Sequence, residues 1–182
     1  MPSERMAATA VALPPGSAVT RAYTSVNLAD AFAIGLPAGA STDPEVLARF
    51  LFAHQPAWIG GLMKVRDLLV VGLGLKTGRH LASLADGARA RRVGIFRVYS
   101  VSETEIILGE DDKHLDFRVS VWCAGAALPK TSRQLVVSTV VHCHNRLGRA
   151  YIFLIAPFHR AVVKASLRRA ARVGWPAAAP RP

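Results

Sequence analysis

Two segments in the most hydrophobic third of the chain carry ionisable and amide side chains where a plain apolar strand would suffice. They are residues 114–121 and 138–145, and a tyrosine and a histidine follow soon after them. Such groups must be solvated, paired or functional, because burying an unpaired charge is costly. Carboxylates and imidazoles can transfer protons, and a guanidinium can stabilise negative charge. The candidate site residues are Asp116, Arg118, His142, His144, Tyr151 and His159, together with Arg66 in an apolar segment upstream.

The register of the two expected strands decides whether these side chains face the core. Pairing the apolar residues of the strands places Asp116 and Arg118 on the same face as His142. In one interpretation this face is solvated and its charges form cross-strand ion pairs. In the other it lines a cavity between sheet and helix, which Trp122 and Val136 on the same face favour. Both interpretations stay open at this point.

Each candidate has a structural role open to it as well as a chemical one. His142 and His144 lie two apart on one strand, so with Asp116 they would supply two imidazoles and a carboxylate to a metal ion. That spacing is common by chance, and we expect neither a metal nor a cofactor. His159, in the first turn of the last helix, would be a neutral general base or a histidine that ties helix to sheet. Tyr151 would donate to a ligand or pack in the core.

The remaining reactive residues point to no familiar catalytic arrangement. Arg66 would bind an anionic ligand group or pair with an acid from another element. Cys123 and Cys143 lie on expected strands, in no metal-ligand spacing, and two thiols make no disulfide framework. No Ser-His-Asp or Cys-His arrangement is evident. We expect a cytoplasmic protein without a membrane span, because there is no signal peptide and the apolar runs fall short of ~20 residues.

Composition and charge bound the class of protein. The chain has 182 residues, 51% of them hydrophobic, which suits one compact domain and excludes global disorder. The net charge of +11 attracts anions. Much of it is scattered arginine in an Ala/Arg-rich sequence, and the clusters at 89–92 and 168–172 lack interleaved stacking aromatics. Nucleic acid is therefore a disfavoured partner, and a small-molecule ligand is favoured.

The periodicity of apolar residues predicts the element order β-α-α-β-β-β-β-β-α. Strands are expected at 29–36, 93–100, 104–110, 113–123, 132–144 and 149–155. Helices are expected at about 43–53, with Thr42 as the cap, at about 56–74, and from Ala156 and Pro157 to Gly174. This order indicates an α+β fold in which a curved antiparallel sheet wraps around a long C-terminal helix. We expect a single domain at 18–174, a flexible N-terminal segment at 1–17 and a disordered tail at 175–182.

Several strings of the sequence resemble a bacterial family, domain of unknown function 2867. They are Leu-Gly-Glu-Asp-Asp-Lys-His-Leu-Asp-Phe-Arg at 108–118, Ser-Thr-Val-Val at 138–141, His-Asn-Arg-Leu-Gly-Arg-Ala-Tyr at 144–151 and Ile-Ala-Pro-Phe-His-Arg at 155–160. Upstream, Tyr23 with residues 29–32, and residues 65–68 with 72–75, match its beginning. The resemblance covers nearly all of 20–173.

The resemblance implies a helix-grip fold similar to START-like (SRPBCC) proteins. Such a fold has a cavity between the curved sheet and the C-terminal helix, often holding an apolar small molecule. The family is also met after a short-chain dehydrogenase-like domain, but no Gly-x-Gly-x-x-Gly follows an expected strand in this chain. The resemblance to the family implies no established activity.

Three functional hypotheses follow from the sequence. The first is a binding domain for a small apolar or cyclic ligand, with the candidate site residues polarising its cavity. The second is a cyclase- or isomerase-type enzyme in which a cavity Asp or His acts as general base and Arg118 or Tyr151 stabilises an enolate. The third is an anion or nucleic-acid surface built from the arginine clusters.

Overall fold

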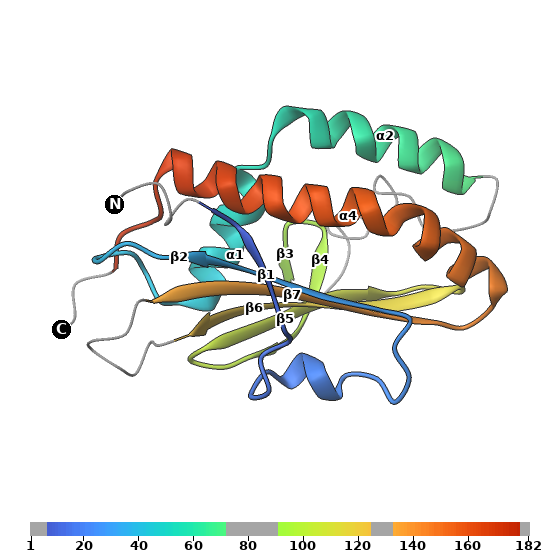
Figure 1. Ribbon diagram of the computed structural model, residues 1–182, viewed down its shortest axis with the longest axis horizontal. Coiled ribbons are helices and arrows are strands. Elements are labelled where there is room, and N and C mark those ends of the chain that lie inside the picture. Colours follow the sequence, from blue (N-terminus) through green and yellow to red (C-terminus); the bar gives the residue numbers. More distant parts are fainter. Residues whose placement is uncertain (1–6, 72–90, 125–132, 179–182) are drawn as a thin grey trace.

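Within the described residues, seven antiparallel strands form one sheet, and a long helix lies across one of its faces (Figure 1). The computed structural model describes residues 7–71, 91–124 and 133–178, except for the side chains of 65–71. The strand order is β1-β2-β7-β6-β5-β4-β3. The strands are β1 (Thr9–Val11), β2 (Leu28–Gly35), β3 (Arg92–Val93), β4 (Phe96–Val101), β5 (Glu105–Asp111), β6 (Leu115–Ala124) and β7 (Gln134–Cys143). The helices are η2 (Ala18–Arg21), α1 (Pro44–Ala53), α2 (Ala57–Val71) and α4 (Arg146–Val173).

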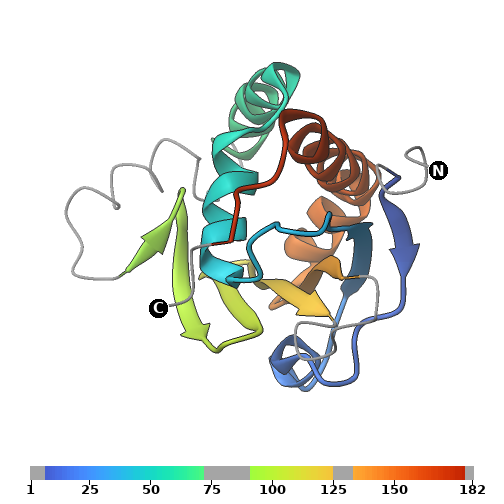
Figure 2. The ribbon, with the colours of Figure 1, turned by 90° about the vertical axis from the view of Figure 1, so that its left-hand side faces the viewer.

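The helices cover one face of the sheet, which we call the inner face. Figures 1 and 2 show α1, α2 and α4 on that side and η2 on the opposite, outer face. Leu135 and Val137 of β7 belong to the same buried cluster as Leu47 of α1 and Leu167 of α4. A curved antiparallel sheet under a long C-terminal helix confirms the predicted α+β class and element order.

Two of the predicted strands differ from what the structure shows. The strand predicted at 93–100 is divided between β3 and β4, whose turn contains Gly94 with φ +59°. The strand predicted at 149–155 is wrong, because these residues are helical. This run is rich in aromatic and branched residues, which suit strands locally. Tertiary packing decides otherwise, because Tyr151, Ile152 and Ala156 meet the sheet at helical spacing.

The C-terminal helix begins ten residues before its predicted start. The side chain of Asn145 caps it by accepting the N–H of Gly148 at 3.0 Å. A Cβ on Gly148 would lie 2.3 Å from the carbonyl oxygen of His114, so glycine permits the close approach of the helix to the β5–β6 turn. Pro157 therefore lies inside α4 and does not open it.

The ends of the predicted domain also need correction. β1 pairs with β2, so the folded unit extends into the expected flexible segment. The expected tail is partly structured, since the backbone N–H of Ala178 donates to the carbonyl oxygen of Gly39 and Trp175 packs near Phe50. The rest of both expected segments, 1–6 and 179–182, lies outside the described residues, as does the predicted end of the second helix at 72–74.

The first long helix is capped by a neighbour of the predicted residue. Asp43, and not Thr42, accepts the backbone N–H groups of Glu45 and Val46, at 2.8 and 3.2 Å. Pro44 occupies the first turn as predicted. The cap fixes where α1 enters the inner layer, and Leu47 is then fully buried.

A buried carboxylate attaches the N-terminal segment to the outer face of the sheet. Glu105 of β5, only 7% exposed, accepts the hydroxyls of Ser17 and Ser120 and the backbone N–H of Ala18 at 2.9 Å. Ser17 itself is fully buried and caps η2. Because the carboxylate has donors on both oxygens, this contact is a well-satisfied anchor for the segment.

Among the residues that the structure describes, one helix has the length and composition of a membrane span, contrary to the expectation from unbroken apolar runs. An 18-residue window of α4 reaches a mean hydropathy of 1.2. This is weak evidence for a span, because the core helix of a globular domain meets the same criterion. Leu167 and Ala170 of α4 are fully buried in the main cluster, which ties the helix to the sheet.

Candidate functional site

The sheet divides the candidate residues into two groups that cannot meet. Asp116 pairs with His142 and Arg118 with Val140 across β6 and β7, so these side chains share one face. Val140 packs with Val19 of η2, which identifies that face as the outer one. The interpretation in which Asp116 and Arg118 line a cavity under the C-terminal helix is therefore wrong. The ion-paired outer face is the interpretation that the structure supports.

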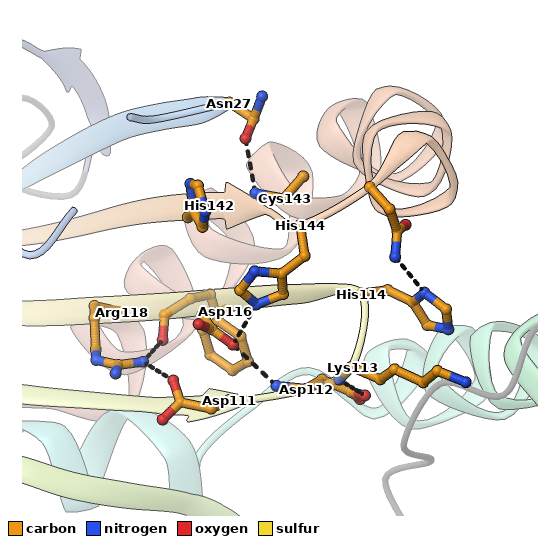
Figure 3. A network of polar contacts seen from close by, with 12 residues as sticks. Asn27, Asp111, Asp112, Lys113, His114, Asp116, Arg118, His142, Cys143 and His144 are labelled. Carbon is orange, nitrogen blue, oxygen red and sulfur yellow. Dashed lines mark hydrogen bonds and ion pairs between the residues drawn. The ribbon is translucent and has the colours of Figure 1, made fainter. Parts of the chain in front are cut away.

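The guanidinium of Arg118 is bound by neighbouring groups of the protein (Figure 3). Its Nη1 donates to Asp111 at 2.7 Å and to the carbonyl oxygen of Phe117 at 2.9 Å. The guanidinium also stacks over the ring of Tyr99, 3.5 Å from the ring centroid. Gly109 lies opposite Arg118, and a Cβ there would be 3.0 Å from Cδ of Arg118. The missing side chain gives the arginine room to cross β5 and reach β4.

The pKa values of the ionisable groups around Arg118 are shifted in directions that suit a structural network. Burial raises the pKa of Asp111, but hydrogen bonds from Arg118 and Tyr99 outweigh it and the net pKa is lowered. Burial, followed by the hydrogen bond to Asp111, raises the pKa of Tyr99 to about 12. Burial also raises the pKa of Tyr23, whose hydroxyl has no hydrogen-bond partner among the described residues. The two tyrosines therefore stay neutral at physiological pH.

The two histidines at the end of β7 take part in separate contacts. His144 Nε2 lies 3.0 Å from Asp116 Oδ1, which also accepts the backbone N–H of Asp112 at 3.1 Å (Figure 3). His142 Nδ1 instead lies 2.9 Å from both Oγ and the carbonyl oxygen of Ser25, and its ring stacks on Tyr23. Within the described part of the chain, no three metal-binding side chains cluster. The acid–histidine pair lies at the surface, with His144 37% exposed.

The inner face holds a different acid–histidine pair, between β2 and α4. His159 Nε2 lies 3.3 Å from Oδ1 of Asp30, and Arg160 Nε lies 3.5 Å from Oδ2. The Asp30 side chain is only 10% exposed, and its Oδ2 has no hydrogen-bond partner among the described residues. Arg160 is near enough for an ion pair but lacks the geometry of a hydrogen bond. A nearly buried carboxylate oxygen is thus left with an open acceptor position.

Other residues on the inner face surround this pair. Thr139 lies opposite Asp30 in the sheet and is buried. Lys164 of α4 lies over the ring of Phe32, 5.2 Å from its centroid. Tyr151 packs against a small buried cluster nearer the start of α4. Of the sequence candidates whose side chains the structure describes, only Tyr151 and His159 therefore lie between sheet and helix.

Sequence reasoning overlooked Asp30. It stands between two alanines at the start of an apolar strand, and an acid in an apolar strand is the same signal that singled out Asp116. Its partner on α4, His159, is one of the candidates that the sequence predicts. The candidate Arg66 lies on α2, but its side chain is outside the described residues.

The described arginines of the first cluster and the two cysteines have simple structural explanations. Arg91 pairs with Glu45, and Arg92 lies 3.3 Å from Glu110. The third member of that cluster, at 89, is outside the described residues. Both thiols are buried, and burial raises the pKa of Cys123 to about 11. The sulfurs are accordingly poor nucleophiles.

Comparison with known proteins gives a family and no activity. No curated protein and no solved structure matches the chain. A family model described as "Protein of unknown function (DUF2867)" matches residues 22–166, which include β2, both histidine pairs and most of α4. The chain therefore belongs to the DUF2867 family.

Proposed function

We propose that the chain binds a small, largely apolar molecule bearing a hydrogen-bond donor, between the inner face of the sheet and α4. The observation that carries this proposal is the incomplete burial of the sheet-facing side of the helix. The buried residues of α4 lie at its ends, with Gly148 at the start and Ser166, Leu167 and Ala170 towards the finish. The helix is thus held at both ends.

The middle of α4 is only half-buried although it faces the sheet. Tyr151, Ile152 and Ala156 contact the buried cluster of the sheet, yet each keeps some exposure, and His159 and Val163 continue the same stripe. Two layers packed as closely as a protein interior would bury such a stripe completely. An apolar-lined space with few polar groups is the usual setting of a small-ligand site.

Asp30 gives this space its polarity. A carboxylate oxygen that is nearly buried without a hydrogen bond carries a desolvation cost that a ligand can offset. An acceptor of this kind selects a hydroxyl or an N–H group, and rejects an analogue that offers no donor. His159 holds the other oxygen in place at 3.3 Å.

Binding is tested with the neutral dye Nile red and two competitors that differ in a single donor, 2-naphthol and 2-methoxynaphthalene. A charge-assisted hydrogen bond contributes about 1.5–3 kcal/mol, so we expect 2-naphthol to displace the dye at roughly 10- to 100-fold lower concentration. Asp30→Ala should remove that preference. If both competitors displace the dye from the unsubstituted protein at the same concentration, Asp30 is not the group that selects the ligand.

A second pair of variants tests the location. Ala156 is half-buried and faces the sheet, whereas Ala161 is exposed on the same helix. Ala156→Phe should fill the space and weaken dye binding at least ~10-fold, because an added ring competes directly for the volume. Ala161→Phe is the matched control and should leave binding unchanged. Dye binding that survives Ala156→Phe in a folded protein would place the ligand elsewhere.

The acid–histidine pair favours a second candidate function, an isomerase-type enzyme that uses the same site. A carboxylate can only accept, so neutral His159 donates from Nε2 to Asp30 and keeps its lone pair on Nδ1. In that tautomer Nδ1 is the general base and Asp30 stabilises the imidazolium that forms. Arg118 cannot stabilise an enolate here because it lies on the outer face.

Proton abstraction is tested by deuterium exchange at the α-carbon of cyclic 1,3-diketones in D2O, followed by NMR. The enzyme hypothesis predicts exchange above the buffer rate that is lost in His159→Gln. If the protein binds the dye but does not accelerate deuterium exchange, the enzyme hypothesis is refuted and the binding function stands.

A further inference from the structure

The outward side of α4 carries a strongly exposed apolar patch, which we call the α4 ridge: Phe153, Leu154, Pro157 and Phe158. Phe153 is 84% exposed, Leu154 57% and Phe158 49%. Scattered exposed hydrophobic residues need no explanation, but three large ones within two turns of one helix form a contiguous patch. Such a patch indicates a contact with another apolar surface.

The charges on α4 are all of one sign. The helix contains no Asp or Glu in its 28 residues. Exposed arginines flank the ridge at both ends, with Arg146 and Arg149 before it and Arg168, Arg169 and Arg172 after it. The complementary surface is therefore apolar in its middle and negatively charged around it.

A second copy of the chain does not fit this pattern. In an antiparallel pair of α4 helices, Arg146 and Arg149 of one copy would lie beside Arg168 and Arg172 of the other. In a parallel pair, each arginine would lie near its own equivalent. Like charges meet in both orientations, and α4 itself offers no acid to offset them.

The surface of an anionic bilayer supplies both the negative charge and the apolar region that complement α4. Its headgroups attract arginine, and the boundary below them accepts Phe and Leu side chains from a helix that lies in the plane. Figures 1 and 2 show α2 next to α4 and further from the sheet, and α2 carries the half-exposed Trp58. Tryptophan is favoured at such interfaces.

We infer that the chain docks on anionic membrane surfaces through the α4 ridge and its flanking arginines. The helix lies in the interface and does not cross the bilayer, because Leu167 and Ala170 keep it packed on the sheet.

The test is co-sedimentation of the full chain with vesicles of phosphatidylcholine containing 30% phosphatidylglycerol, beside vesicles of phosphatidylcholine alone. We expect binding to the mixed vesicles, little binding to the neutral ones and a fall with added salt. Phe153→Asp should weaken binding roughly 10- to 100-fold, because it removes a buried aromatic ring from the contact. Arg168→Gln should weaken it about fivefold.

Matched controls separate the docking surface from general effects of charge. Val101 is 43% exposed on β4, and Arg21 is exposed on η2 across the sheet. Val101→Asp and Arg21→Gln make the same changes of charge away from α4 and should each change binding less than twofold. Equal losses in control and test variants, or no binding to mixed vesicles, overturns the inference. A dimer in light scattering that Phe153→Asp dissociates, without vesicle binding, assigns the ridge to a second copy instead.

Discussion

Two nearly buried carboxylates of the sheet, Glu105 and Asp30, should respond differently to neutralisation. Glu105 accepts three hydrogen bonds, from Ser17, Ala18 and Ser120. Asp30 has a long contact to His159 at 3.3 Å and an ion pair with Arg160 at 3.5 Å, and one of its oxygens has no hydrogen bond. We compare Glu105→Gln with Asp30→Asn, which keep the shape of each side chain and remove its charge.

The expected change in the free energy of unfolding follows from the contacts of each carboxylate. In Glu105→Gln, an amide NH2 replaces an oxygen that faces a donor, so at least one charge-assisted bond of about 1.5–3 kcal/mol is lost and a donor is left unsatisfied. We expect the free energy of unfolding to fall by about 3 kcal/mol, or roughly 6–12 °C in Tm for a chain of this size. In Asp30→Asn, the loss of the long ion contacts to His159 and Arg160 is offset by the smaller cost of burying an amide. The change there should stay within ~1 kcal/mol.

Urea unfolding followed by circular dichroism measures both values, and the Nile red competition reports the function of Asp30 in parallel. The slope of the denaturation curve should be the same in both variants, since neither changes the surface exposed on unfolding. A loss of ~3 kcal/mol in Asp30→Asn would refute the reasoning. It would show that Asp30 is a structural ion-pair partner of α4 and not a ligand group kept open.

Two further predictions concern the elements that position the sheet and helix. Gly148→Ala should lower the free energy of unfolding by ~3 kcal/mol or more, as thermal denaturation will show, because its Cβ would lie 2.3 Å from a backbone oxygen that cannot turn aside. The lowered pKa of Asp111 makes its carboxylate contribute stability above its ordinary value of 3.8, and this contribution is lost as pH falls through the lower folded value. Asp111→Asn should therefore flatten the acid limb of stability against pH, and equal acid limbs in variant and parent would contradict the assignment.

The order of elements could be read from the sequence because apolar periodicity and turn residues specify it locally. The two middle strands of the sheet, β6 and β7, agree with their predicted bounds to within two residues. The start of α4 could not be read in the same way. Residues 149–155 favour a strand locally, and Pro157 resembles a helix start. The contact of Gly148 with a turn 34 positions earlier decides the matter, and periodicity carries no such information.

Of the acid–histidine pair on the inner face, His159 was predicted from the sequence, but Asp30 and the arrangement of the pair were not. Register correctly placed Asp116 with Arg118 and His142, since opposed positions follow from pairing the apolar sets. Which face the last helix covers depends on how α4 crosses the sheet. That crossing puts His159 beside Asp30, more than a hundred residues away, and leaves Asp116 on the other side.

The polar richness of β6 and β7 therefore differs in kind from the single acid on β2. Around Arg118 and Asp111, donors and acceptors meet one another, and such closed networks specify strand pairing and orientation. Two buried hydroxyls on the outer face, those of Tyr23 and Ser138, lack a hydrogen-bond partner among the described residues, but both are neutral and cost less to bury than a carboxylate oxygen. On the inner face, a charged acceptor is held under a helix that is fully packed only at its ends. A chain selected for stability alone would replace that carboxylate or complete its hydrogen bonds, and this is the reason to place the function at Asp30.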